Sequence, residues 1–275
     1  MSQTQGTAEA AKTQQSPPAE GDGRGAAGWP VLALIVAAAL IYGLSAAIGG
    51  AVVSAGFWAL QSFGLVPSGL SLTELLLSPE AAEGPAAAYH FAVVGGIFIF
   101  NAVAMVALIL AIARRSLAGG RAAAAPLRRV APWAIVGGII VVPIVTLAAF
   151  VVAYRLAGIP IPAETGFDPA DWRMWAYPLG LVIAAPIAEE IAFRGWLFSG
   201  IHRRTGSAQA AVWTTAVLWA LLHVSQGWVK AAALLPTGLL LGAMRLKTGS
   251  LRPTLAGHMA MNAAGLVYMT WLAGG

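Results

Sequence analysis

The sequence predicts an all-α fold, a polytopic transmembrane helical bundle of about seven spans. Of its 275 residues, 59% are hydrophobic and only 10% are charged, whereas about a quarter of the residues of a soluble domain are charged. The apolar residues fall in long runs, and the short stretches between these runs hold most of the arginines. Long apolar runs with basic connections are typical of helices that cross a bilayer.

The charge balance and the cysteine content exclude some classes of protein. The net charge is +5, which in a soluble protein could indicate a nucleic-acid partner. In a membrane protein Lys and Arg collect in cytoplasmic loops, so we assign the basic excess to orientation and expect no nucleic acid. Cysteine is absent, which excludes disulfides and thiolate metal sites but leaves the redox compartment undetermined.

The N-terminal part predicts a tail followed by one long helix. Residues 1–28 are rich in Ala, Gly, Gln, Pro and Ser, which predicts a disordered tail. The first apolar run begins at Trp29, too far in for an ordinary cleaved signal peptide. A span needs about 20 residues, so residues 29–66 are long for one crossing and short for two. We favour one helix over about 29–50, extended or bent near Gly49.

The rest of the chain alternates between loops and apolar runs. Residues 67–89 predict an amphipathic loop, and Pro143 should kink the span in which it lies. We divide the chain into N-terminal transmembrane helices and loops over residues 29–177 and a functional core over 178–272, made of the last four helices. The further spans are predicted at His90–Ala113, Trp133–Tyr154, Trp175–Ser199, Ala208–Val224, Trp228–Met244 and Leu255–Leu272.

The basic residues of the loops predict the orientation. Most of them lie after the second, fourth and sixth predicted spans, which places those loops in the cytoplasm. With seven spans the N-terminus is inside and the C-terminus outside, and two crossings over residues 29–66 would move only the N-terminus. We expect a multi-pass protein of a bacterial plasma membrane. The cytoplasmic residues are Arg114, Arg115, Arg121, Arg128, Arg129, Arg203, Arg204, Arg245, Lys247 and Arg252. The opposite loops hold Glu164, Asp168, Asp171 and Lys230.

The fourth predicted span contains Glu189, Glu190 and Arg194, and ionisable residues are costly in hydrocarbon unless they pair, line a wet cavity or do chemistry. Residues four apart share a helix face, so Glu190 can pair with Arg194. Glu189 points about 100° away and is left to face a cavity. The alternative is a structural ion-pair network that joins helices.

Two later spans carry further polar side chains. His223 follows Trp219 by one helical turn, and His258 and Asn262 are also four residues apart, so one face presents an imidazole and an amide. The structural alternatives are an interfacial histidine bonded to a headgroup or a backbone carbonyl, and polar residues that join helices by hydrogen bonds.

These motifs together resemble those of the CPBP family, which includes the type II CAAX prenyl endopeptidases and the Abi-type bacterial membrane proteins. The family pattern is EExxxR, then FxxxH, then HxxxN on separate helices. Here it corresponds to Glu189–Arg194, Trp219–His223 and His258–Asn262. Phe193 and Gly195 match the usual extension of the first motif. Trp219 departs from the typical Phe but keeps an aromatic ring. The resemblance covers about residues 178–270.

The resemblance implies an intramembrane endopeptidase that acts on a membrane-embedded or lipid-anchored protein or peptide, such as a prenylated protein. Glu189 and His223 would activate a water, His258 and Asn262 would stabilise the oxyanion, and Glu190 and Arg194 would orient the site. In the zinc-dependent alternative, Glu189, His223 and His258 hold the metal with an open water position. We favour the metal-free version.

Two other functions stay open: a non-proteolytic Abi-like membrane protein, and a transporter that uses the carboxylates as a proton relay. A proton relay would need acidic residues on several further spans, and a catalytically inactive protein would be expected to have lost a motif residue.

The motif residues can meet at one site only under a geometric condition. Glu189 and His223 lie about 20 Å from the cytoplasmic ends of their spans, but His258 lies about 9 Å away. Either residues 247–256 dip inward, or the fourth span ends early.

Overall fold

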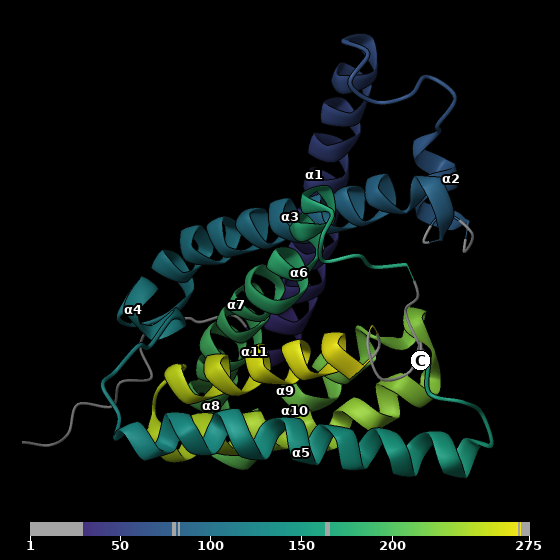
Figure 1. Cartoon of the computed structure of the whole chain (residues 1–275). Coiled ribbons are helices and arrows are strands. Elements are labelled where there is room, and N and C mark those ends of the chain that lie inside the picture. Colours follow the sequence, from purple (N-terminus) through teal and green to yellow (C-terminus); the bar gives the residue numbers. More distant parts are fainter. Residues whose placement is uncertain (1–29, 79–80, 82, 163–165, 269, 271–275) are drawn as a thin grey trace, which may run out of the picture.

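The computed structural model describes residues 30–78, 81, 83–162, 166–268 and 270, and every regular element in this part is a helix (Figure 1). The predicted all-α fold is therefore confirmed. The expected tail over residues 1–28 lies outside the described residues. Five of the described helices are long and apolar enough to cross a membrane. Each of the seven predicted spans corresponds to a helix or a helical run, but the fifth has only 14 residues, about 21 Å.

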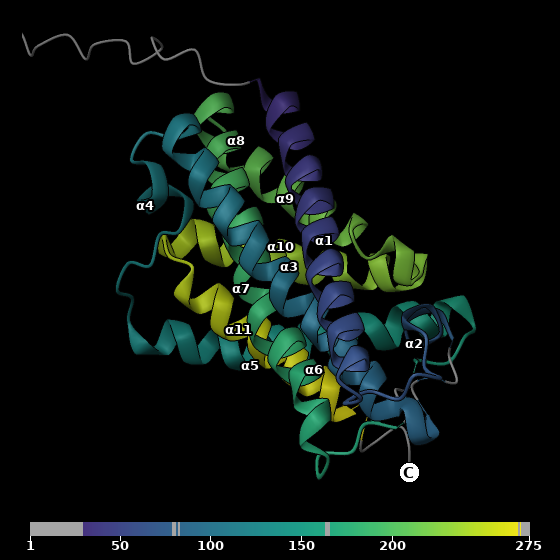
Figure 2. The same cartoon turned by 90° about the horizontal axis from the view of Figure 1, so that it is seen from above.

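The first two long helices, α1 (Val31–Ser62) and α3 (Ala87–Ser116), pack side by side (Figure 2). α1 is one continuous helix, so the extended single helix is correct and two crossings are wrong. No break occurs at Gly49. This glycine instead lets α1 and α3 approach closely, because a Cβ there would lie 2.8 Å from the backbone nitrogen of Asn101. The predicted loop between α1 and α3 contains the short helices α2 (Leu72–Leu77) and η3 (Gly84–Ala86).

A second group of helices holds α5 (Pro132–Ala157), α9 (Ala208–Leu221), α10 (Trp228–Thr248) and α11 (Arg252–Val267). α5 packs along α11 and α10, and α10 packs along α9 (Figure 1). Small residues permit these contacts, as is common between helices in membranes. A Cβ at Gly138 would lie 2.6 Å from the Pro253 carbonyl oxygen, whereas a Cβ at the neighbouring Gly137 would meet no atom within 4 Å.

The fourth predicted span is the centre of the fold, a helical run over Trp172–Thr205 between α3 and the second group of helices. It is not one regular α-helix. Two π-helical stretches flank the short α-helix that ends at Glu189, and the second begins at Glu190. π turns are rare in proteins as a whole, but many of those that occur are at functional sites. The run consists of η4 (Trp172–Trp175), α6 (Ala176–Pro178), η5 (Leu179–Ala184), α7 (Ala185–Glu189), η6 (Glu190–Leu197) and α8 (Phe198–Thr205).

A short helix, α4 (Gly120–Ala124), packs on the central run. A Cβ at Gly195 would overlap the Ala124 carbonyl oxygen, which gives a packing reason for the glycine that extends the first motif. The connection from α10 to α11 is also deeply placed. Ser250 and Leu251 are fully buried, and the Leu251 amide donates to the Pro126 carbonyl at 2.9 Å. The connection is therefore packed inside the protein and not on its surface.

Candidate active site

A cavity of about 480 Å³ lies between the two groups of helices, and Glu189, His223, His258 and Asn262 all line it. Glu189 is the last residue of α7, the two later motif residues come from α11, and His223 comes from the turn after α9. The structure thus brings together the four cavity-facing residues that the sequence singled out. Most of the other lining residues are apolar, which suits a cavity within a bilayer.

Glu190 and Arg194 lie behind this cavity and are fully buried. The Arg194 guanidinium donates to Glu190 Oε1 at 2.9 Å, so the predicted pairing is confirmed, although the backbone between them is π-helical rather than α-helical. Arg194 also donates to the Gly238 carbonyl at 3.3 Å, and its guanidinium lies 4.8 Å from the Trp219 ring centroid. These contacts join the central run to α9 and α10.

His258 lies between the two carboxylates. Its Nδ1 is 2.9 Å from Glu190 Oε1, and its Nε2 is 3.8 Å from Glu189 Oε2. An ionised carboxylate can only accept, so Nδ1 carries a proton and donates it to Glu190. This bond fixes the plane of the imidazole and aims Nε2 at Glu189 and the cavity. Glu190 therefore orients His258 as well as neutralising Arg194.

Glu189 is held from a second side by Trp219, which is fully buried. The indole Nε1–H donates to Glu189 Oε2, and the Glu189 side chain keeps 18% of its surface exposed. A phenylalanine, which the family pattern has here, offers no such donor. This hydrogen bond was not identified from the sequence, although the indole N–H, which usually finds a partner when buried, was the available signal.

His223 does not lie on a helix. α9 ends at Leu221, so the predicted span Ala208–Val224 was too long, and His223 lies in the turn before η7 (Val224–Gln226). Its Nδ1 donates to the Trp219 carbonyl at 3.0 Å, because a carbonyl can only accept. In the neutral ring Nε2 is then a free acceptor. The turn gives this nitrogen access to the cavity that His223 lines.

Asn262 satisfies a backbone carbonyl that the π-helix leaves without a partner. The Ala185 amide bonds to the Gly180 carbonyl, five residues back. In that register the Leu181 carbonyl should receive the amide of Pro186, which has no N–H. Asn262 Nδ2 donates to the Leu181 carbonyl at 2.8 Å instead. One N–H of the Asn262 amide is thereby used, and one remains.

Zinc binding would require Glu189, His223 and His258 to converge as ligands. Among the described residues, no group of three or more His, Asp or Glu side chains is close enough to hold a metal ion. Glu189 and His258 are adjacent, but His223 does not complete a ligand set with them. The residues in this arrangement therefore do not fit the zinc alternative, and we derive no step through a metal.

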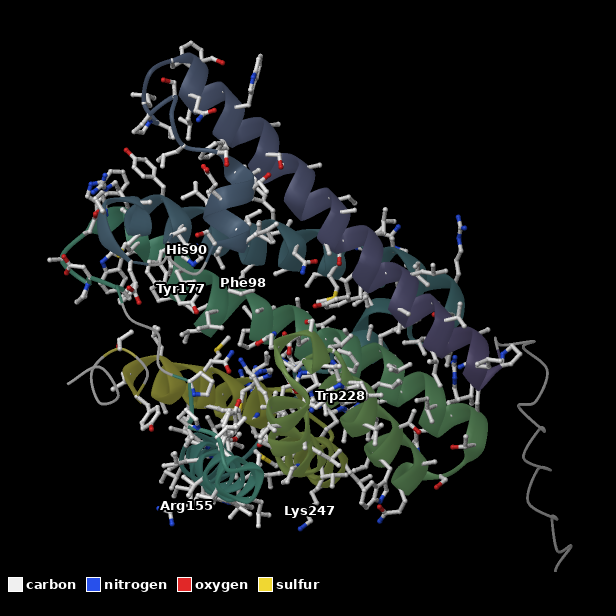
Figure 3. The ribbon with its side chains drawn as sticks, turned by 90° about the vertical axis from the view of Figure 1, so that its right-hand side faces the viewer. His90, Phe98, Arg155, Tyr177, Trp228 and Lys247 are labelled. Carbon is white, nitrogen blue, oxygen red and sulfur yellow. The ribbon has the colours of Figure 1, made fainter. Side chains whose placement is uncertain are left out.

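The two other histidines of the chain, His90 and His202, lie elsewhere. His90 lies in the first turn of α3 (Figure 3), and its Nδ1 contacts the Leu75 carbonyl. His202 stacks on Phe198 with ring centroids 6.2 Å apart. Neither histidine lines the cavity. Tyr42, Asn101, Gln226 and Lys230 do line it, and sequence reasoning gave them no role in the site.

The fold and the site together define a polytopic helical membrane protein with a cluster of carboxylates, histidines and an asparagine at an internal cavity. In comparisons with known proteins, residues 171–264 match the family model of type II CAAX prenyl endopeptidase Rce1-like proteins. The resemblance to the CPBP family is thus confirmed over the segment that holds all three motifs. At the family level, this match supports an intramembrane CAAX protease. No curated protein and no solved structure matches the chain.

Proposed function

We propose that this protein is an intramembrane endopeptidase that hydrolyses a peptide bond of a membrane-embedded or lipid-anchored substrate with a water activated by Glu189 and His223. One observation carries the proposal most directly. Glu189 faces the cavity with a hydrogen bond from Trp219 and with His258 Nε2 at 3.8 Å, while the second carboxylate is neutralised behind it. One carboxylate is free to take a proton, and the other holds the site in place.

The different roles of Glu189 and Glu190 define the reaction. Glu189, assisted by Nε2 of His223, takes a proton from water as the water oxygen attacks the peptide carbonyl carbon. The carbonyl oxygen becomes an oxyanion, and the remaining N–H of Asn262 can donate to it. The proton held by Glu189 then passes to the leaving amine as the C–N bond breaks. No proton is gained or lost over the cycle.

His258 acts as the second donor to the oxyanion when both of its ring nitrogens carry protons. Glu189, Glu190 and Arg194 alone sum to one negative charge, and a buried uncompensated charge is costly. An imidazolium at His258 balances that charge. Its Nδ1–H stays on Glu190, and its Nε2–H faces the cavity. Glu190 thereby supports the developing charge on the substrate through His258.

The lining of the cavity supports an apolar substrate. A volume of about 480 Å³ is typical of a ligand pocket, and it suits a short extended stretch of peptide with apolar side chains or part of a prenyl chain. A proton relay has less support, because α1, α3 and α5 contain no Asp or Glu, and a transporter would need polar groups along a path through those helices.

The decisive experiment is a cleavage assay of the purified protein in detergent on a fluorogenic membrane peptide, with Glu189→Ala as the control and with or without a chelator. We expect cleavage that Glu189→Ala abolishes and the chelator leaves intact. Loss with the chelator and recovery with zinc would favour the metal alternative. Cleavage that survives Glu189→Ala, or a folded protein that cleaves no peptide in a broad library, would count against the proposal.

A further inference from the structure

Asn101 is a polar side chain in the middle of α3 that the described part of the protein leaves without a hydrogen bond. It lines the cavity and is half-buried. A polar residue within a span commonly joins two helices by a hydrogen bond, but no such bond holds the Asn101 amide among the described residues. The ordinary structural role of an asparagine in a membrane helix is therefore not met here.

The two polar atoms of the Asn101 amide have different surroundings. Oδ1 is enclosed by the protein and has no partner among the described residues. α1 covers this part of α3 closely, since a Cβ at Gly49 would lie 3.2 Å from the Asn101 Cβ. Because the oxygen is enclosed and the residue lines the cavity, the amide nitrogen Nδ2 is the polar atom that the cavity reaches.

Asn101 lies at a different level of the cavity from Glu189. α3 and the central run pass in the same direction, because a Cβ at Gly180 would lie 2.7 Å from the Phe98 Cβ and the Trp196 indole donates to the last residue of α3 at 3.0 Å. In this alignment the two levels are about 9 Å apart along the helices. An extended peptide advances about 3.3 Å per residue, which corresponds to about three residues.

We infer that Asn101 is a substrate-positioning residue whose Nδ2 donates to a backbone carbonyl of the bound peptide, about three residues from the bond that is cleaved. Every residue of a peptide carries a backbone carbonyl, so the contact fixes the register of the chain and does not select a side chain. The inference rests on the proposed function for its ligand. It adds to the site a residue of α3, which lies outside the segment that the family model matches.

The chemistry of the cavity gives this donor a purpose. A peptide that enters apolar walls loses the water on its backbone, and each polar group left without a partner is costly. Asn262 already uses one N–H on the Leu181 carbonyl, and its other N–H is assigned to the oxyanion. Asn101 supplies a second amide donor at a level where the substrate chain has a further carbonyl. The enclosed Oδ1 is a cost to the resting protein, and such unsatisfied groups call for a functional explanation.

The contact is tested by binding, which keeps it apart from the proposed reaction. The parent protein is Glu189→Gln, which leaves the peptide intact. The probe is a fluorescently labelled apolar peptide in which one backbone amide at a time is replaced by an ester, whose carbonyl is a weaker acceptor and which lacks the N–H. Fluorescence anisotropy in detergent gives the Kd of each analogue for the parent and for the parent carrying Asn101→Leu.

At one position of the peptide, we expect the ester to weaken binding to the parent about fivefold, the usual contribution of one hydrogen bond, and to leave binding to Asn101→Leu unchanged. Met105→Leu is the matched control, because Met105 is four residues further along α3 and also lines the cavity. In that variant the same ester should still weaken binding. Asn101→Leu should keep or raise the unfolding temperature, because it removes an enclosed oxygen without a partner.

Ester effects that are equal in the parent and in Asn101→Leu at every position would overturn the inference, and so would their loss in Met105→Leu as well. The absence of binding by any peptide of a broad apolar library would do the same. A lower unfolding temperature with equally weakened binding of all analogues would show a structural role instead. Cleavage that depends on Glu189 without an ester effect that depends on Asn101 leaves the proposed function standing. The reverse result supports the subsite and counts against the proposed reaction.

Discussion

Trp219 donates its indole N–H to the cavity-facing carboxylate of Glu189, and its backbone carbonyl accepts from Nδ1 of His223. One residue thus positions both groups that we propose to activate water. Its ring also lies 5.3 Å from that of His258. The aromatic position of the second motif is therefore a structural link between the three motifs.

The Trp219→Phe variant should keep the fold and lose activity. Phe restores the family-typical residue and keeps an aromatic ring, but it removes the donor to Glu189. A hydrogen bond to a charged group contributes about 1.5–3 kcal/mol, so kcat should fall by about tenfold or more. Trp213→Phe is the matched control, because Trp213 is on the same helix and is 54% exposed. Equal rates for the two variants would show that the indole donor is not used.

The Glu189→Gln variant should lose activity by about 10² or more, the usual contribution of general-base catalysis. The amide keeps the shape of the side chain and can still accept from Trp219, so the protein should stay folded. The measurement is single-turnover cleavage together with a thermal unfolding curve in the same detergent. A mild effect on cleavage would contradict the assignment of Glu189 as the base.

The Glu190→Gln variant should instead be unstable. It leaves Arg194 buried without its counter-charge, and breaking a buried pair by removing one partner costs about 3–5 kcal/mol. Adding Arg194→Met should restore part of the thermal stability and yield, because it removes the unpaired charge. If Glu190→Gln abolishes cleavage without lowering stability, and Glu189→Gln is mild, the two roles are the reverse of those assigned here.

Asn262 should have a structural and a catalytic role that a second substitution can separate. Asn262→Leu removes the donor to the Leu181 carbonyl, and an unsatisfied buried group costs about 1–3 kcal/mol. Pro186→Ala supplies the missing backbone N–H five residues after Leu181. The double variant should therefore recover thermal stability but not activity. Full recovery of cleavage would show that Asn262 does not donate to the oxyanion.

Gly195→Ala should disrupt the packing of α4 on the central run. The new Cβ would overlap the Ala124 carbonyl oxygen, and backbone atoms cannot move aside as a flexible side chain can. We expect a lower unfolding temperature and a lower yield. Gly137→Ala is the control, since a Cβ at Gly137 meets no atom within 4 Å and alanine is favoured over glycine in helices. Similar stability for the two variants would contradict the close contact.

The sequence by itself determined those features that depend on local spacing or on composition. The apolar runs located the long helices, because a span needs about 20 apolar residues. The separation of four residues between Glu190 and Arg194 was enough to predict their pairing. The pair forms although the backbone there is π-helical and not α-helical. The order of the three motifs pointed to the segment that the family model matches.

Only the tertiary structure determined the features that depend on contacts between residues far apart in the sequence. The π turns around α7 shift which backbone carbonyl lacks a partner, and Asn262 on α11 satisfies it. α9 ends before His223, so that the imidazole reaches the cavity from a turn. His258 meets Glu190 because the α10–α11 connection is buried against the chain before α5. Each of these contacts joins residues far apart in sequence, and neither helix periodicity nor hydropathy reports on such pairs.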